Sequence, residues 1–510
     1  MQSFKEVREN ETQGSLTIFD RVIFKGHMRS FHFNLAFERF LSRQNVLLMD
    51  YGKYAEEMTG RLSAHAKSMA SDAGRPYVFI QSPNQSKEEM AKFIAERDKI
   101  DGGLVCVLGA VEPCKAFTVR GNGKTQKKEV VYEYRKCTHF YFYYIDEEFG
   151  WMHVRLQSWL PFSIQVYISG HEYVARQLRV QGIGYQEYDN TFIQIDDLDA
   201  AQKLCDKFAH RKWAPVLQAF ARRHNPLLDE LQAAGIQEYY WVVNASEIAT
   251  DLMFNTQKTL DDLLPELFQE SILTFNAKDV MRFLGKKLHN NYKGEIVHSL
   301  KERPEGWRVK HSAKTNSIKM YNKCNVLRIE TTINNSREFR MPAQNQRRWK
   351  PLNKSVGNFW RLYQIGKEAN QRYLDALDNA SIQDGEAVQA LDCLCRSQTS
   401  ESGKRIAKFH PVTLDDCSLF AAVLSSQHCI HGFRNKDICA ALFHLETTSP
   451  QDAKRLSARV SRLIAKLRGH GLVETVGNSR LYRATAYGIK VMSTAIHYRF
   501  IDFPQAFLPA

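Results

Sequence analysis

Apolar and polar residues alternate from Asn316 to Asn334, over the stretch NSIKMYNKCNVLRIETTIN. A period of two predicts half-buried β-strands, here joined as a hairpin between residues 322 and 325. Successive side chains of a strand point to opposite faces. One face is therefore predicted to be apolar, with Ile318, Met320, Leu327, Ile329 and Ile333. The other face gathers the chemically capable side chains, which are Lys319, Tyr321, Lys323, Arg328, Glu330 and Thr332.

The first 235 residues show two different patterns. Helical periodicity covers 34–41 and 54–69, and a strand is followed by a capping box in which Ser86 precedes Glu89 by three residues. The apolar strand LVCVLGAV then completes a β-α-β unit. Between residues 129 and 169 the pattern changes to a meander of aromatic strands. The sequence therefore predicts an N-terminal α/β domain, over 1–235, with an aromatic antiparallel sheet.

The middle of the chain, 236–376, is predicted to be a second domain built on a β-sheet. It begins with the strand candidate YYWVVNASEIATDLMF, continues with a helix over 277–288 and the hairpin, and ends with a long helix after residue 356. Polar composition over 377–410 predicts a linker. The predicted fold class is therefore α+β, with several domains.

The last hundred residues, 411–510, predict the order helix, helix, long helix, strand, turn, strand, helix. The long helix carries an apolar stripe and beside it a basic stripe. This segment resembles bacterial winged-helix modules, which implies duplex DNA binding; a merely solvated basic face, or packing against a partner protein, is the alternative. The residues that the resemblance places at DNA are Arg455, Arg459, Arg462 and Lys466 on the helix and Arg480 at the wing tip.

Composition favours a polyanionic partner. The 510 residues carry a net charge of +14, and basic surfaces bind phosphate backbones because counterions are released. The expected partner is therefore nucleic acid, with DNA first and RNA possible, and an anionic membrane surface is the rival. No apolar stretch is long enough to span a bilayer. The N-terminus lacks the apolar core of a signal peptide, so a cytoplasmic location is expected.

The polar face of the hairpin suggests phosphodiester chemistry. A tyrosine hydroxyl titrates near 10, so it becomes a nucleophile only where cations or a metal stabilise the phenolate. Lys319 and Lys323 lie two residues on either side of Tyr321 and hence on the same face. Glu330 on the partner strand could bind a divalent cation that polarises a phosphodiester and lowers the pKa of the phenol.

Two further acids are expected beside this hairpin. Glu247 and Asp251 fall on the same side of the strand SEIATDLMF, which is predicted to be open, with the small Ala249 between them. Together with Glu330 they could hold Mg²⁺ or Mn²⁺. Residues i and i+4 lie about 13 Å apart along a regular strand. Either a bulge intervenes or only one of the two acids is a ligand.

The stretches EIATD, KTNSIKMYNK and LRIETTIN resemble the strand motifs of tyrosine-dependent rolling-circle initiators. These include plasmid replication initiators of the trans-acting type, conjugative relaxases and filamentous-phage gene II proteins. The resemblance covers residues 236–340, and Glu247 stands where the family usually has aspartate. It implies a metal-dependent nick in which Tyr321 attacks a DNA phosphate and leaves a phosphotyrosine and a free 3′ hydroxyl. The sequence contains no His-x-His pair, so only carboxylate ligation of the metal is expected.

A second interpretation stays open, in which the protein binds DNA or RNA without cutting it. A tyrosine on an amphipathic hairpin commonly packs against a cross-strand neighbour. The aromatic strand HFYFYYI could stack the bases of a single strand, or it could form core. The further basic residues expected to contact nucleic acid are Lys310, Arg328, Arg347 and Arg348.

Overall fold

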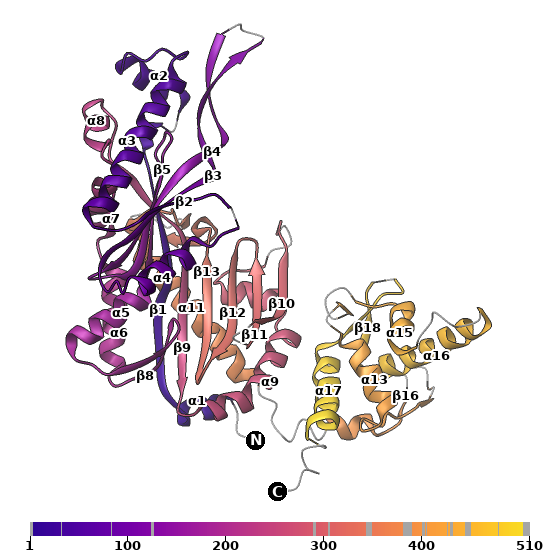
Figure 1. Ribbon diagram of the computed structural model, residues 1–510. Helices are drawn as coiled ribbons and strands as arrows, with labels where there is room; N and C mark the ends of the chain where they lie inside the picture. The colour runs from indigo at the N-terminus through magenta and orange to yellow at the C-terminus, as the bar shows by residue number, and fades with distance from the viewer. Residues whose placement is uncertain are drawn as a thin grey trace. The chain divides into compact units, whose positions relative to one another are not determined.

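The computed structural model describes residues 4–31, 33–82, 84–123, 127–288, 292–303, 306–342, 349–380, 390–399, 403, 405–425, 427–428, 432–443, 450–477 and 479–502. Over these residues the protein is a mixed α+β structure (Figure 1). The chain divides into two compact units. The larger unit comprises Glu11–Asp262 and Ala277–Leu374, and the smaller unit comprises Met1–Asn10, Leu263–Asn276 and Asp375–Ala510.

The larger unit is organised by a sheet of 11 strands. Neighbouring strands are antiparallel except β2 and β3, which are parallel and are connected through helix α4, as the β-α-β pattern predicts. In their order across the sheet the strands are β10 (Ile296–Arg303), β11 (Gly306–Ala313), β12 (Asn316–Lys323), β13 (Val326–Ile333), β9 (Tyr240–Phe254), β1 (Thr12–His27), β6 (Ile164–Ser169), β5 (Gly150–Gln157), β4 (Lys127–Asp146), β3 (Gly103–Asn122) and β2 (Tyr77–Ile80).

Strand β1 joins the two halves of this sheet. It is 16 residues long, and it pairs with β6 on one side and with β9 on the other. The two regions of the sequence expected as separate domains therefore contribute to one continuous sheet, and the boundary expected at residue 235 falls within the larger unit. A long central strand forms here because Leu16, Phe19 and Val22 are all buried.

Helices pack on both the aromatic and the hairpin halves of the sheet. The helix predicted over 277–288 is shorter, because Gly285, with a φ of 68°, ends it.

Two small hairpins complete the unit, β7 (Tyr185–Tyr188) with β8 (Thr191–Ile195), and β14 (Arg340–Pro342) with β15 (Trp349–Pro351). The helices that lie wholly or mainly in this unit are α2 (Asn34–Arg43), α3 (Tyr51–Asp72), α4 (Lys87–Arg97), α5 (Gly170–Gln181), α6 (Leu198–His210), α7 (Trp213–His224), α8 (Leu228–Ala233), α10 (Ala277–Phe283) and α11 (Phe359–Ala380).

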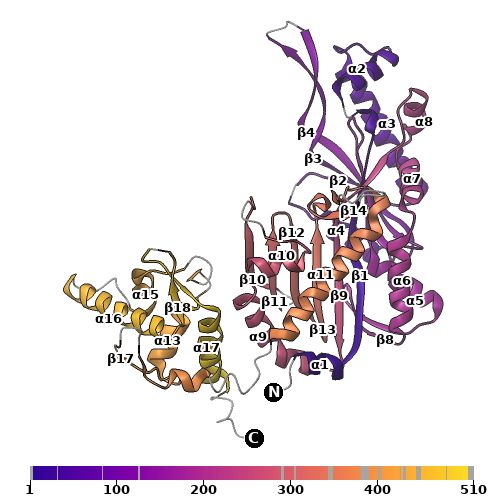
Figure 2. The same ribbon diagram turned by 180° about the vertical axis from the view of Figure 1, so that it is seen from behind.

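Helices α10 and α11 cross one face of β9 to β13, as the view from behind shows (Figure 2). The amide of Asn370 on α11 donates to the Ile248 carbonyl at 3.0 Å, and Tyr373 contacts His311 at 3.0 Å. The apolar face predicted for the hairpin packs here, and Ile318, Met320, Leu327 and Ile329 have no exposed surface. The alternation in the sequence therefore predicted this face correctly.

The opposite face is partly covered too. Hairpin β7–β8 lies against β9 and β13, and the side chains of Ala249 and Asp251 have no exposed surface. The expectation of an open side along β9 is therefore wrong around Asp251. Local alternation predicts which residues share a face, but it cannot predict that a distant hairpin will cover that face.

The smaller unit has the element order expected from the sequence. Its core includes Leu394 and Phe409, so parts of the segment 377–410, expected as a linker, pack with this unit. Helix α9 (Gln257–Leu273) lies partly in this unit. Among the described residues, no helix has the length and apolar character needed to cross a bilayer. The other elements are α1 (Phe4–Asn10), β16 (Gln398–Thr399), β17 (Arg405–Ile406), α13 (Leu414–Val423), α15 (Asn435–Leu442), α16 (Pro450–Gly469), β18 (Val473–Thr475), β19 (Tyr482–Ala484) and α17 (Ala486–His497).

Candidate functional site

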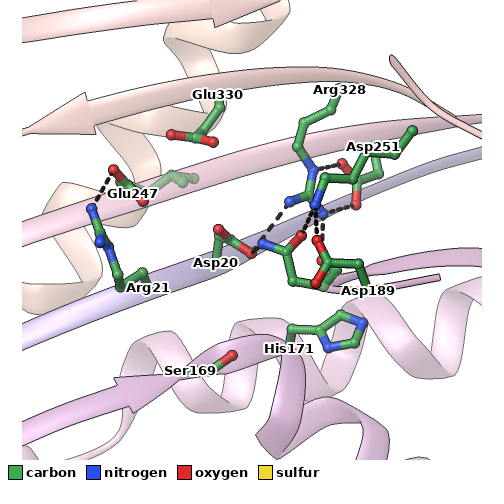
Figure 3. Close-up of polar contacts among 12 residues, drawn as sticks. Asp20, Arg21, Ser169, His171, Asp189, Glu247, Asp251, Arg328 and Glu330 are labelled. Carbon is green, nitrogen blue, oxygen red and sulfur yellow. Dashed lines mark hydrogen bonds and ion pairs between the residues drawn. The ribbon is translucent and has the colours of Figure 1, made fainter. Parts of the chain in front are cut away.

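Three carboxylates converge where β1, β9 and β13 lie side by side (Figure 3). Asp20 comes from β1, Glu247 from β9 and Glu330 from β13, and one oxygen of each lies within 4.8 Å of the others. Glu330 stands opposite Ala249, two residues from Glu247 along β9. The sequence placed Glu247 and Glu330 on one face, and the structure brings them together with Asp20.

A β-bulge in β1 positions Asp20 in this group. Pairing with β9 is regular from Gly14 to Phe19 and resumes at Arg21, which stands opposite Glu247. Asp20 is the extra residue, and the bulge allows two neighbouring residues to face one partner. Arg21 consequently donates to Glu247 at 2.7 Å, while Asp20 joins the carboxylates. Between Glu247 and Asp251 the pairing of β9 with β13 is regular, and only Glu247 joins the carboxylates, which agrees with the expectation that one of the two acids is a ligand.

Negative charge is crowded around Asp20. Burial raises the pKa of its carboxyl to about 6. The Arg328 guanidinium opposes that rise, whereas the neighbouring carboxylates of Glu330, Glu247 and Asp251 add to it. An additional cation at this point would therefore be electrostatically favourable.

Lysine and arginine side chains already contact the other two acids. Lys319 donates to Glu330 at 2.5 Å and lies 3.5 Å from Glu247, which also accepts from Arg21. Burial by itself would raise the pKa of Glu330, but the Lys319 ammonium and the hydrogen bond from Tyr321 more than offset it, and the pKa is lowered. Glu330 is thus held as a carboxylate.

The Tyr321 hydroxyl is aimed at this group and donates to Glu330 Oε2 at 2.6 Å. The tyrosine is 7% exposed, and burial together with the Glu330 carboxylate raises the pKa of the phenol well above its usual value. The resting side chain is therefore a neutral phenol. A nucleophilic role requires a base that removes the proton as the new bond forms, and Glu330 is placed to accept it.

Asp251 and Arg328 form a separate, buried ion pair. Arg328 stands opposite Asp251 and donates to it from Nε at 2.6 Å and from Nη2 at 2.7 Å. It also donates to Asp20 at 3.3 Å and to the Asn190 carbonyl at 2.8 Å. Arg328 has no exposed surface, so its expected role as a nucleic-acid contact does not fit the structure. Asp251, expected as a metal ligand, is held by Arg328 outside the carboxylate group.

The turn of hairpin β7–β8 lies directly beside the site (Figure 3). Asp189 and Asn190 both accept hydrogen bonds from Lys323, and Asn190 donates to Asp20 at 2.7 Å. Lys323 is therefore engaged by the hairpin, although the sequence suggested a role beside the phenol. Nearby, Nε2 of His171 is buried without a hydrogen-bond partner among the described residues, and burial lowers the pKa of this histidine to about 3.

The predicted basic residues of the smaller unit lie on its surface. Lys466 is half-buried, lies 3.6 Å from Asp416 and packs over the Phe409 ring. Three arginines of α16 and one on the turn between β18 and β19 are exposed, namely Arg455, Arg459, Arg462 and Arg480. In the larger unit Lys310 is half-buried on β11, and the two remaining predicted contacts, Arg347 and Arg348, lie outside the described residues.

Sequence reasoning missed Asp20, which is the residue that completes the site. The only local signal was an acid within an apolar strand, in the segment FDRVIFKG. Buried strands rarely tolerate a carboxylate without a partner, so an acid at this position indicates that a polar or charged group lies next to it. Its partners lie more than 200 residues away in the sequence, and no local pattern connects them.

The donor set suits a hard divalent cation. Mg²⁺ and Mn²⁺ prefer oxygen ligands, and Mg²⁺ is commonly held by one or two carboxylates together with water and phosphate oxygens. Asp20, Glu247 and Glu330 could therefore hold such an ion, and the crowding of negative charge around Asp20 favours it. Comparisons of this chain with protein-family models, with curated proteins and with solved structures give no match.

Proposed function

We propose that this protein binds nucleic acid and cuts a phosphodiester, with Tyr321 as the nucleophile and the three carboxylates as the site of Mg²⁺ or Mn²⁺. The observation that carries the proposal is the 2.6 Å hydrogen bond from the Tyr321 hydroxyl to Glu330, because Glu330 is also one of those carboxylates. Glu330 would therefore act both as the base for the Tyr321 hydroxyl and as one of the ligands of the cation. The resemblance of this region to tyrosine-dependent rolling-circle initiators agrees with the assignment.

The reaction would exchange one ester bond for another. The phenol oxygen of Tyr321 forms a bond to phosphorus and its proton passes to Glu330, while the bond from phosphorus to the 3′ oxygen breaks. The leaving oxygen takes a proton from water and becomes a free 3′ hydroxyl, and the 5′ phosphate stays on the tyrosine. A bound divalent cation would supply positive charge that favours the phenolate and polarises the phosphate. Lys319, which lies beside Glu330, adds positive charge at the same place.

The second candidate is a protein that binds nucleic acid without cutting it. Each of the three carboxylates already has a cationic partner within the chain, namely Arg328 for Asp20, Arg21 for Glu247 and Lys319 for Glu330. A buried network of this kind can serve the fold alone. The raised pKa of Tyr321 is also what a structural tyrosine would have.

Both candidates include duplex DNA binding by the smaller unit. The exposed arginines of α16 follow one side of the helix, and Val460, Ile464 and Leu467 are buried on the other. The element order agrees with the winged-helix resemblance. In such modules a helix enters the major groove and the wing contacts the backbone, which would place Arg455, Arg459 and Arg462 at the groove and Arg480 at a phosphate.

A covalent adduct with tyrosine separates the two candidates. Incubation of the full chain with labelled single-stranded DNA or RNA and Mn²⁺ should give a denaturation-resistant adduct. Tyr321→Phe should abolish it, because the ring remains and only the hydroxyl is lost. Asp20→Asn should lower the yield and weaken the metal dependence. Tyr134→Phe is the control. Tyr134 is 73% exposed and lies on β4, which β5 and β6 separate from β1 in the sheet.

Two results would decide against cutting. An adduct that persists in Tyr321→Phe would exclude this tyrosine as the nucleophile. Binding of the labelled strands without an adduct, over a range of divalent metals, would favour the second candidate.

A further inference from the structure

A row of three side chains crosses the sheet from its edge to the phenol. Lys301 on the edge strand β10 stands opposite Arg308 on β11, and Arg308 stands opposite Tyr321 on β12. Residues directly opposite each other project to the same face of a sheet. The row therefore presents two cations that lead to the Tyr321 hydroxyl.

A second row runs parallel to the first, two residues along each strand. Ser299 on β10 stands opposite Lys310, Lys310 opposite Lys319, and Lys319 opposite Glu330. This row ends at the carboxylate that accepts the hydrogen bond of the phenol. The two rows thus end at Tyr321 and Glu330, which are joined by a hydrogen bond.

The two rows lie on the face that α10 and α11 do not cover. The intervening residues, such as Val309, Met320 and His311, are buried on the helix side. Figure 1 shows β10, β11 and β12 from the side without these helices, and Figure 2 shows the helices across the other side. Exposure falls toward the site, since Lys301 is exposed while Arg308 and Lys310 are half-buried.

Like charges face each other along these rows. Lys301 is paired with Arg308 and Lys310 with Lys319, and like charges directly opposite destabilise a sheet. Lys319 forms an ion pair with Glu330, but no ion pair to a carboxylate occurs for Lys301, Arg308 or Lys310 within the described residues. Partial burial and the neighbouring cations lower the pKa of Lys310. An anion lying across this face would relieve the repulsion.

We propose that this basic face, defined by Lys301, Arg308, Lys310 and Lys319, is a track for the phosphodiester backbone of a single-stranded nucleic acid. The track would lead one phosphate to Tyr321 and Glu330. The proposal rests on the proposed function for the nature of the partner, and it goes further by assigning the path. Three strand spacings separate β10 from β13, so the path is about 14 Å long.

A single strand fits this face better than a duplex. The Tyr321 hydroxyl lies within the sheet surface, close to strands that hairpin β7–β8 covers, and a flexible chain can follow such a surface. Duplex DNA has a persistence length of about 50 nm and bends only at a cost. The track residues are lysines and an arginine, so they would contact phosphates and not read base sequence.

Binding to short labelled oligonucleotides tests the track without any cutting. The full chain carrying Tyr321→Phe, in EDTA, is compared with the same chain carrying Lys301→Gln, Arg308→Gln and Lys310→Gln in addition. DNA and RNA strands of the same sequence are both measured by fluorescence anisotropy over a salt series. Three lost phosphate contacts should weaken binding at least tenfold and lower the logarithmic salt slope by about 2.

The matched control removes three exposed lysines elsewhere in the larger unit, Lys53→Gln, Lys99→Gln and Lys203→Gln. It should leave the salt slope close to that of the parent, and circular dichroism should show that both triple variants fold like the parent. Equal losses in the two triple variants, or no binding of either DNA or RNA by the parent, would overturn the track. An adduct-negative protein whose binding still depends on the track residues would overturn cutting alone, and an adduct-positive protein whose binding does not would overturn the track alone.

Discussion

Arg328 organises the buried part of the site. Its guanidinium donates two hydrogen bonds to Asp251 and one each to Asp20 and the Asn190 carbonyl, and none of its surface is exposed. The residue therefore ties together β1, β9, β13 and hairpin β7–β8. Removing one partner of a buried ion pair leaves the other charge without compensation.

Arg328→Met should destabilise the larger unit by about 3–5 kcal/mol, because Asp251 and Asp20 would lose their buried partner. Urea unfolding followed by tryptophan fluorescence measures this loss. Arg61→Met is the control, since the Arg61–Glu230 pair is more than two-fifths exposed on both sides, and it should change stability by about 1 kcal/mol or less. The double variant Arg328→Met with Asp251→Leu should recover part of the stability. Equal losses for the two single variants would contradict the role given to Arg328.

At the residue scale, the sequence predicted part of the site. Glu247, Glu330 and Tyr321 were expected on one face because alternation with a period of two is local information. Asp20 was not expected, since it depends on a bulge and on strand pairing across more than 200 residues. Lys323 and Arg328 were expected to be available to substrate. Arg328 is engaged by Asp251, and Lys323 by Asp189 and Asn190, which lie in a turn that no local pattern places beside the hairpin.

At the element scale, close packing of helix α11 on strand β9 sets the back of the site. A Cβ added at Gly366 would lie 2.6 Å from the Ile248 Cβ, closer than real Cβ atoms approach. Glycine at this position allows the helix to sit directly on the strand that carries Glu247. In contrast, a Cβ added at Gly60, within α3, would meet nothing within 4 Å.

The two glycines should therefore respond in opposite ways to alanine. Gly60→Ala should stabilise the protein by about 0.5–1 kcal/mol, because alanine has the better helix propensity. Gly366→Ala has the same propensity gain but should destabilise by about 1–3 kcal/mol, because the packing is too tight. Thermal unfolding of both variants is the measurement. Stabilisation by Gly366→Ala would contradict the close packing of α11 on β9.

At the scale of the whole molecule, buried histidines make the stability of the larger unit depend on pH. Burial lowers the pKa to about 4 for His153 and to about 3 for His171, His224 and His311. In the unfolded chain these groups titrate near 6.5, so between about pH 3 and 6.5 the unfolded state binds more protons. The contribution of these histidines to the free energy of unfolding is therefore constant above pH 6.5, and the free energy of unfolding decreases as the pH falls through this window. The raised pKa of Asp20 acts in the opposite direction and offsets one part of this loss.

Each of these histidines should contribute about 2 kcal/mol of lost stability between pH 6.5 and 5. All seven tryptophans of the sequence precede residue 375, so tryptophan fluorescence follows the larger unit alone. Its urea midpoint should fall on acidification, and His224→Gln should reduce that fall. His210→Gln is the control, because His210 is exposed. An unchanged pH dependence in His224→Gln would contradict this account.

The sequence by itself determined many of the helices and strands, the alternation of faces in the β12–β13 hairpin and the element order of the smaller unit. It could do so because periodicity, capping and turn residues act over a few positions. The tertiary structure alone decided that one sheet spans both halves of the larger unit, that the β1 bulge brings Asp20 to Glu247 and Glu330, and that hairpin β7–β8 covers this corner of the sheet. These features depend on pairing between strands far apart in the chain. Strand pairing at that distance is set by packing of the whole sheet and leaves no local pattern to recognise.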